Sequence, residues 1–190
     1  MHLLDLPVEI RLEIYSYLLV TQDYDKLRPV PGGPRLSLGT PLLRTCKQIN
    51  AEATPVLYGS NLLLADMRRL TKQARLRLRS RPFSDPKMLA MVRRWWLTVP
   101  LDVEEPFYEP EDAGAAFANV DELVLEFMSS FAGNGAAWRR AALRPFEAVR
   151  GVKTVRIVGC PAELEVYADW LKRSMMSRQG SEMQPYVGSP

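Results

Sequence analysis

The chain has few of the residues on which catalytic and metal sites depend. Of its 190 residues, one is a histidine, His2, and two are cysteines, Cys46 and Cys160. A Ser–His–Asp or Cys–His arrangement needs a histidine that the fold holds in place, and His2 lies beside the first residue of the sequence. The metal-site spacings C-x-x-C and H-E-x-x-H are both absent. We therefore expect no catalytic, cofactor-binding or metal-binding residue, and we expect a protein that is not an enzyme.

Long apolar runs and closely spaced cysteines are also missing. No apolar run approaches the roughly 20 residues of a membrane-spanning helix, and no basic segment followed by an apolar core indicates a signal peptide. Two cysteines far apart do not make a disulfide framework. This cysteine usage suits a reducing compartment, so we expect a cytoplasmic or nuclear protein with no membrane partner. A hydrophobic content of 47% is ordinary for a folded domain.

The first segment with a clear pattern predicts a helix after Leu3. Asp5 is suited to cap the first turn, and Pro7 suits an early helical position, where no backbone N–H is needed. Apolar residues then recur along one stripe at helical spacing: Leu6, Ile10, Ile14, Tyr17 and Leu18. The stripe fits two interpretations, packing against the chain's own core or docking of a partner helix.

A second helix is predicted from Thr40, which suits the cap, with Pro41 as the first helical residue. Its apolar stripe is Leu42, Leu43, Cys46, Ile49 and Ala53. We expect Cys46 to be a small buried hydrophobic residue rather than a nucleophile. Pro55 is expected to break or bend the helix, and Gly59 to begin a turn.

Four apolar runs bounded by turn residues predict strands farther along the chain, and the first of them, at 61–65, is also compatible with a helix. They cover residues 61–65, 93–99, 121–127 and 153–158, and helix candidates over 135–149 and 161–176 follow the last two. The interval between the later strands is about 28 to 31 residues. Alternation of strands and helices at this interval implies a parallel sheet. Trp95 and Trp96 are expected to point to opposite faces of it.

These elements predict a mixed α/β fold, of α+β type, in three parts. A helical module covers residues 1–65 with a loop insertion at 21–40, in which Leu36–Leu38 resembles a short edge strand. A strand–helix lobe covers residues 66–176, and a polar tail at 177–190 is expected to be flexible unless it docks. The lobe fits a short, irregular array similar to leucine-rich repeats. A small α/β layer of other origin fits equally well, because the repeat consensus is absent.

The net charge of +3 is unevenly distributed along the chain. Residues 1–99 carry 16 basic and 8 acidic residues, whereas residues 100–190 carry 9 and 14. One stretch is basic without an acidic interruption: Arg68, Arg69, Lys72, Arg75, Arg77, Arg79 and Arg81. We predict that Asp66 caps a basic helix here, extending to about Ser80, on which the apolar stripe is Leu70, Ala74 and Leu78.

The basic stretch has three interpretations. Its residues pair with the acidic cluster at 102–112, contact an acidic protein partner, or contact the phosphates of a nucleic acid. Residues 68–81 contain no aromatic side chain that would stack on bases. Nucleic acid is therefore the less favoured partner.

Two short signatures occur in order within the first third of the chain. Residues 6–15 read Leu-Pro-x-Glu-Ile-Arg-x-x-Ile-Tyr. Residues 42–53 read Leu-Leu-Arg-x-Cys-x-Gln-Ile-x-x-Glu-Ala, and Leu-Tyr-Gly-x-Asn follows at 57–61. Together they resemble the N-terminal module of the large fungal family of F-box-like proteins.

The resemblance implies a protein that binds other proteins. F-box proteins recruit the adaptor Skp1 through their N-terminal helices, and a repeat lobe that follows selects a client for ubiquitination. The implied adaptor contacts are Leu6, Pro7, Ile10, Ile14 and Leu18. The leading hypothesis is a non-enzymatic interaction module, an F-box-type substrate receptor of a ubiquitin ligase, with a Skp1-like adaptor and a client as partners. The alternative is a nucleic-acid- or chromatin-associated protein that uses the basic helix 68–81.

Overall fold

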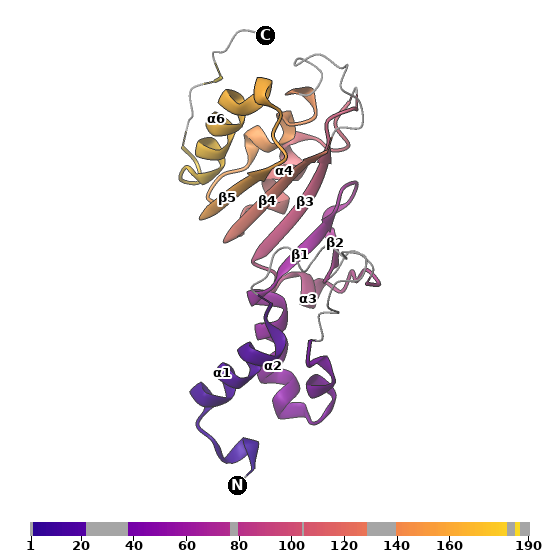
Figure 1. The fold of residues 1–190 in the computed structure, drawn as a ribbon, viewed down its shortest axis with the longest axis vertical. Helices are drawn as coiled ribbons and strands as arrows, with labels where there is room; N and C mark the ends of the chain where they lie inside the picture. The colour runs from indigo at the N-terminus through magenta and orange to yellow at the C-terminus, as the bar shows by residue number, and fades with distance from the viewer. Residues whose placement is uncertain are drawn as a thin grey trace.

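The computed structural model describes residues 2–21, 38–76, 80–103, 105–128, 140–181 and 185–186. Two helices form one end of the elongated molecule, and a sheet with its helices forms the rest (Figure 1). The α-helices are α1 (Val8–Leu19), α2 (Lys47–Ser60), α3 (Pro86–Leu89), α4 (Pro110–Ala116) and α6 (Glu165–Met176). Short 3₁₀ helices are η1 (Leu3–Asp5), η3 (Thr40–Arg44), η4 (Arg144–Ala148) and η5 (Ala162–Leu164). The predicted mixed α/β class is confirmed.

The sheet has five strands in the order β2-β1-β3-β4-β5. The strands are β1 (Leu62–Asp66), β2 (Leu70–Arg75), β3 (Arg94–Pro100), β4 (Glu122–Met128) and β5 (Thr154–Val158). β1, β3, β4 and β5 are parallel, and β2 pairs antiparallel with β1 at one edge. The four strands predicted from apolar runs are confirmed to within one or two residues at each end, and so is their parallel arrangement.

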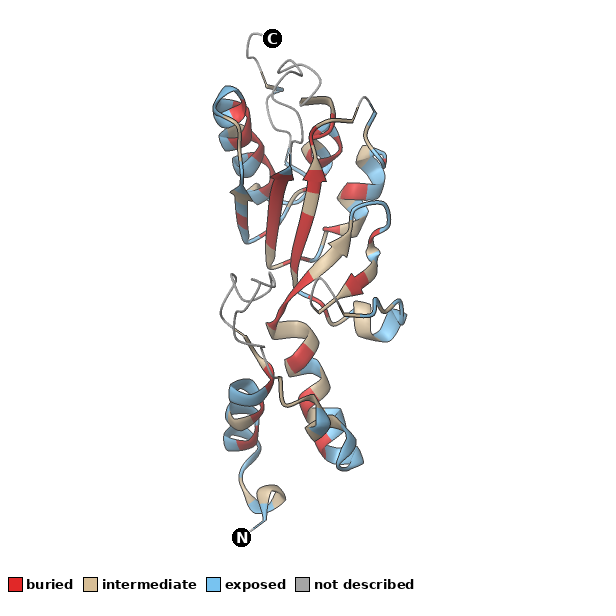
Figure 2. Ribbon diagram, turned by 45° about the vertical axis from the view of Figure 1, so that its right-hand side comes forward, coloured by how far each residue is buried: buried red, intermediate tan, exposed pale blue. Residues whose placement is uncertain are grey.

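The main core lies on the face of the sheet that the later helices cover. Alternate residues of β3 and β4, such as Trp95 and Leu125, point to this face and are buried there. α4, η4 and α6 supply the opposing side chains, among them Phe117, Phe146 and Leu171. Figure 2 shows the buried residues concentrated in the central strands and on the inner sides of these helices.

The opposite face of the sheet holds a smaller apolar cluster of Leu62, Trp96 and Val124. Trp95 and Trp96 therefore point to opposite faces, as predicted, and both are buried. The indole Nε1 of Trp96 donates to a carboxylate oxygen of Glu126 at 3.1 Å, which satisfies the polar edge of the buried ring.

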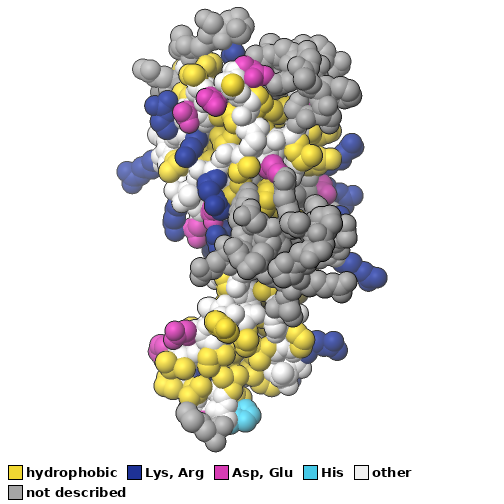
Figure 3. Space-filling view, viewed as in Figure 1, with side chains coloured by type: hydrophobic (Ala, Val, Ile, Leu, Met, Phe, Trp, Pro, Cys, Tyr) yellow, Lys and Arg dark blue, Asp and Glu magenta, His cyan; other side chains and the backbone are white. Residues whose placement is uncertain are grey.

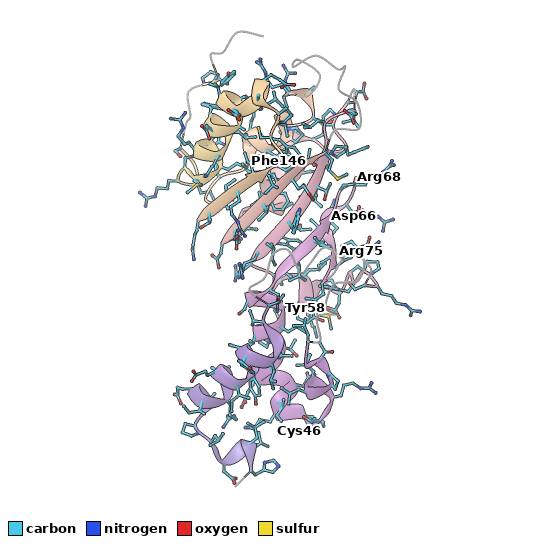
Figure 4. All side chains as sticks on the ribbon, in the orientation of Figure 1. Cys46, Tyr58, Asp66, Arg68, Arg75 and Phe146 are labelled. Carbon is cyan, nitrogen blue, oxygen red and sulfur yellow. The ribbon has the colours of Figure 1, made fainter. Side chains whose placement is uncertain are left out.

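Tyr58 joins the helical end to the sheet. Its side chain packs against the main core and also against a separate apolar cluster between α1 and α2, and its ring meets Phe83 edge-on at a centroid distance of 5.1 Å. The cluster between the helices consists of Tyr15, Leu19, Ile49, Ala53 and Leu57. The guanidinium of Arg94 in β3 also donates to the carbonyl oxygen of Ser60, the last residue of α2, at 2.6 Å. Figure 4 shows Tyr58 at this junction. None of the helices in the described parts of the chain is long and apolar enough to cross a membrane.

The basic helix predicted over residues 66–80 is wrong. Residues 67–69 form a turn, and β2 follows along the edge of the sheet. Leu70 and Ala74, four residues apart, share one face of a strand as readily as one face of a helix, so the pattern was ambiguous. Backbone pairing with β1 decides in favour of the strand. The carboxylate of Asp66 does accept backbone N–H groups, but from the two arginines of the turn, at 2.9 Å each.

The second predicted helix is divided in two. η3 ends at Arg44, and α2 begins after Cys46, whose Sγ accepts a hydrogen bond from the N–H of Ile49 at 3.5 Å. Cys46 is exposed and caps the helix, so the expectation of a buried residue is wrong. α2 also continues through Pro55 to Ser60. Because proline has no N–H, the carbonyl oxygen of Ala51, four residues earlier, receives no helical hydrogen bond from Pro55. Both Ala51 and Pro55 are exposed, so they lie on the solvent side of α2.

Two further predictions are only partly met. In place of one helix over 135–149, the described residues from 140 onward form a short helical turn and η4, whereas residues 135–139 lie outside the described range. The predicted edge strand at 36–38 also falls largely outside it, and Leu38 has no regular structure. The helix predicted over 161–176 is confirmed as η5 and α6. In the tail, Tyr186 packs edge-on against Tyr167 at 5.1 Å.

Candidate functional site

The outer surface of α1 is apolar. Arg11, Tyr15 and Leu19 are the buried residues of this helix. Five other large apolar side chains of this helix are exposed: Val8, Ile10, Leu12, Tyr17 and Leu18. Exposure reaches 44% for Ile10 and 88% for Tyr17. Figure 3 shows hydrophobic side chains gathered over this end of the molecule.

The residues implied as adaptor contacts lie on or beside this surface. Pro7, Ile10 and Leu18 are exposed, whereas Leu6 and Ile14 are half-buried. With 3.6 residues per turn, Ile10, Ile14 and Leu18 follow one another along the helix, in a row rotated by about 100° from the buried row of Arg11, Tyr15 and Leu19. In the described part of the chain, neither Ile10 nor Leu18 belongs to an apolar core cluster. We refer to Pro7, Ile10, Ile14, Tyr17 and Leu18 as the α1 face.

A buried ionic network holds α1 against α2. Arg11 donates from Nε and Nη2 to the two carboxylate oxygens of Glu52, at 2.8 and 2.6 Å, and from Nη1 to the carbonyl oxygen of Leu6 at 2.5 Å. The hydroxyl of Tyr15 donates to Glu52 at 3.0 Å, and so does the amide of Gln48. Such a bidentate pair fixes both the distance between the helices and their register.

Asn61 ties the ends of the same two helices together. Its side chain is fully buried, and its Nδ2 donates to the carbonyl oxygens of Leu19 and Leu57, at 2.7 and 2.8 Å. Its Oδ1 accepts from the N–H of Thr21 at 2.9 Å. One amide thus satisfies carbonyl groups near the C-terminal ends of both α1 and α2, which would otherwise be buried without partners.

The polar positions of the two signatures therefore have a structural role. Arg11 and Tyr15 belong to the first signature, Glu52 to the second, and Asn61 to the turn after it. Arg11 is not one of the residues of the predicted apolar stripe, and its burial was not predicted. The two signatures do contain residues of opposite charge, Arg11 in the first and Glu52 in the second, that could have suggested an ion pair. Among the described residues, the exposed side chains of the α1 face, Ile10, Tyr17 and Leu18, do not belong to the apolar cluster between α1 and α2.

Glu52 makes the stability of this module depend on pH. Hydrogen bonds from Arg11, and then from Gln48, lower the pKa of the Glu52 carboxyl from 4.5 to about 2. A carboxyl with a depressed pKa stabilises the folded state fully above its unfolded-state pKa and loses this contribution as pH falls through its folded-state pKa. We expect the melting temperature of Glu52→Gln to lie several degrees below that of the wild type at neutral pH. The gap should narrow between pH 4.5 and pH 2.

A thermal denaturation series from pH 2 to pH 7 measures this gap. Glu13→Gln is the matched control, because Glu13 is exposed on α1 and has no side-chain hydrogen bond to a described residue. It should melt with the wild type at neutral pH. A gap between wild type and Glu52→Gln that stays constant down to pH 2 would contradict the ionic network.

The basic residues do not share a helical face. Arg68 and Arg69 lie in the β1–β2 turn, Lys72 and Arg75 lie in β2, and Arg81 lies in the segment after it. Arg77 and Arg79 fall outside the described residues. Figure 4 shows Arg68 and Asp66 at the outer end of the hairpin and Arg75 farther along it. A surface formed by all seven side chains on one helix is therefore excluded.

The turn nevertheless meets the acidic loop. The guanidinium of Arg68 lies over the ring of Phe107, 5.0 Å from its centroid. Within the described ranges, no ion pair joins Arg68, Arg69 or Lys72 to the loop that leads into α4. The contact that the structure describes between the basic turn and the loop is thus the one between Arg68 and the Phe107 ring.

The described residues offer little to a reaction mechanism. Burial raises the pKa of the Cys160 thiol to about 11, with smaller effects from nearby carboxylates, so this thiol is protonated near neutral pH. His2 is exposed, and its Nδ1 accepts from the N–H of Leu4 at 3.3 Å in the first turn of η1. No group of three or more His, Cys, Asp or Glu side chains within the described ranges is placed to hold a metal ion.

Comparison with protein-family models, curated proteins and solved structures gives no match for this chain.

Proposed function

We propose that the protein is a non-enzymatic interaction module whose α1 face docks onto an adaptor protein of the Skp1 type. The proposal rests on one observation, the different orientation of the polar and the apolar side chains of α1. Its polar signature residues, Arg11 and Tyr15, point inward to Glu52, whereas its apolar residues, including Ile10, face solvent. An amphipathic helix normally turns its apolar side to its own core, so an outward apolar face favours a partner.

The energetics favour docking. Burying one large aliphatic side chain contributes about 1.5–3 kcal/mol, and the α1 face presents several. The helix is already held rigidly by the Arg11–Glu52 pair, so little conformational entropy is lost on binding. Docking of a preformed helix onto a groove or a second helix is a recurrent mode of recognition.

The sheet end of the molecule is then available to hold a client. Its parallel strands begin at Leu62, Arg94, Glu122 and Thr154, with near-regular spacing similar to that of repeat lobes. An F-box-type substrate receptor of a ubiquitin ligase would have this layout, with the adaptor at α1 and the client on the lobe, and it would act in the cytosol or nucleus. The nucleic-acid alternative loses the helix on which it was based.

Affinity purification from a fungal extract tests this proposal. The full-length tagged protein should recover a Skp1-type adaptor together with a cullin, identified by mass spectrometry. The tagged Ile10→Glu variant provides the matched negative. Recovery of other proteins without the adaptor, from a protein shown to be folded, would contradict the proposal.

A further inference from the structure

A pocket lies beside the β1–β2 turn, in the part of the molecule that the sheet forms. Its volume is about 410 Å³, within the usual range for side-chain and small-ligand sites. Arg68, Arg69 and Lys72 line one side, and Phe107, Tyr108 and Asp112 line the other. The turn belongs to the sheet end of the molecule, whereas α1 belongs to the helical end (Figure 1).

The pocket has an excess of positive charge. Arg69 and Lys72 are exposed, and neither forms an ion pair with a described residue. Arg68 is held at the rim by its position over the ring of Phe107. Among the described residues that line the pocket, three are cations and one, Asp112 in the first turn of α4, is acidic. An anionic group is therefore the complementary ligand.

The turn that carries these cations is fixed in place. Asp66 accepts hydrogen bonds from the backbone N–H groups of Arg68 and Arg69. Leu70, which follows, has a φ of 50°, a backbone conformation that residues other than glycine rarely adopt. Its side chain is buried in the main core, which holds this conformation. A preformed turn loses little entropy when a ligand binds.

The remaining side chains that line the pocket are mainly apolar, and they form a surface of limited size. Phe107 is 36% exposed, and Ala115 and Ala116 of α4 complete the wall. The ring of Tyr108 is held from behind by Phe146, edge-on at 5.8 Å. This surface suits one bulky apolar side chain next to the anionic group.

An extended nucleic acid fits less well. The strand would pass over Glu109, Glu111 and Asp112 at the start of α4, which would repel its phosphates. One face of the Phe107 ring is already covered by Arg68, which leaves less of it for base stacking. A single anionic side chain reaches Arg69 and Lys72 without a continuous run of negative charge.

We propose that this pocket binds a short peptide segment of a partner protein in which an acidic residue stands next to a bulky apolar residue. The carboxylate contacts Arg69 and Lys72, and the apolar side chain packs on Phe107 and α4. Binding at this pocket does not depend on the adaptor, because the two surfaces share no residue. If the peptides do not bind the pocket, the proposed docking of the adaptor on the α1 face is not affected. If the adaptor does not bind, the proposed peptide site is likewise not affected.

Fluorescence anisotropy with the full-length protein tests the proposal. The probes are fluorescein-labelled ten-residue peptides with a central Glu-Leu or Glu-Phe pair, and matched peptides with Gln in place of Glu. The glutamate peptides should bind at least about tenfold more tightly than the glutamine peptides, because a charge-assisted hydrogen bond is lost in the latter. Added salt should weaken the binding of the glutamate peptides.

A charge-reversal pair assigns the binding to the pocket. The double variant Arg69→Glu/Lys72→Glu should weaken binding of the glutamate peptides at least about tenfold. The control double variant Lys87→Glu/Lys172→Glu makes the same change in net charge at exposed positions outside the pocket and should bind as the wild type does. The proposal would be overturned if glutamate and glutamine peptides bound equally, or if both double variants lost the same affinity for the glutamate peptides. Tight binding only to a single-stranded oligonucleotide would also overturn it.

Discussion

An Ile10→Glu variant is expected to bind a Skp1-type adaptor at least about 100-fold more weakly than the wild type, equivalent to about 2.7 kcal/mol. The substitution removes an apolar side chain from the α1 face and places a charge where the partner would desolvate it. Because Ile10 is 44% exposed and faces away from α2, the variant should melt within about a degree of the wild type. Isothermal titration calorimetry with purified adaptor, together with thermal denaturation, gives both quantities.

Ser16→Glu is the matched control for this experiment. Ser16 is exposed on the same helix but lies off the α1 face, and the substitution adds the same charge. It should retain adaptor affinity within about threefold of the wild type. If Ile10→Glu unfolds, Ile10 belongs to the core. If both variants lose adaptor affinity equally, the loss comes from nonspecific charge repulsion. Either result would contradict docking through the α1 face.

Phe146→Ala is expected to give the largest loss of stability, about 3–5 kcal/mol. Phe146 is fully buried between the sheet and its helices, and its ring lies 5.8 Å from that of Tyr108 and 6.4 Å from that of Phe117. Truncation would leave a cavity among rigid aromatic neighbours, which have little freedom to collapse into it. Figure 4 shows its position against the strands. Urea denaturation followed by tryptophan fluorescence measures the change in the free energy of unfolding.

The control for this loss is Phe107→Ala. Phe107 is also aromatic, but it is 36% exposed and lies at the rim of the pocket. Its truncation should cost less than about 1 kcal/mol, because little cavity forms at the surface. Similar losses for the two variants would mean that Phe146 is not enclosed as the structure shows.

The strands were predictable from the sequence because of how they are buried. Most residues of β3 and β4 are buried, on both faces of the sheet, and five of the seven in each strand are apolar, as is typical of parallel strands. Such runs, bounded by turn residues, are visible without knowledge of the fold. The order of the sheet follows from the alternation with helices, since sequential parallel strands normally neighbour one another.

The basic hairpin and the buried face of α1 were not predictable in the same way. For β2, the spacing of four residues between Leu70 and Ala74 fits both the 3.6-residue repeat of a helix and the two-residue repeat of a strand. Backbone pairing with β1 decides in favour of the strand. For α1, a charged residue normally faces solvent. Arg11 is buried because Glu52, 41 residues away in sequence, supplies a bidentate partner. Local patterns contain no information about such a partner.

The account depends most on direct binding between the wild-type protein and a Skp1-type adaptor, measured by isothermal titration calorimetry with both proteins purified. We predict a one-to-one complex that the Ile10→Glu variant does not form, with a negative heat-capacity change from burial of the apolar α1 face. Absence of binding by a wild-type protein that is shown to be folded would contradict the central claim. The exposed α1 face would then have to be explained by a partner of another kind.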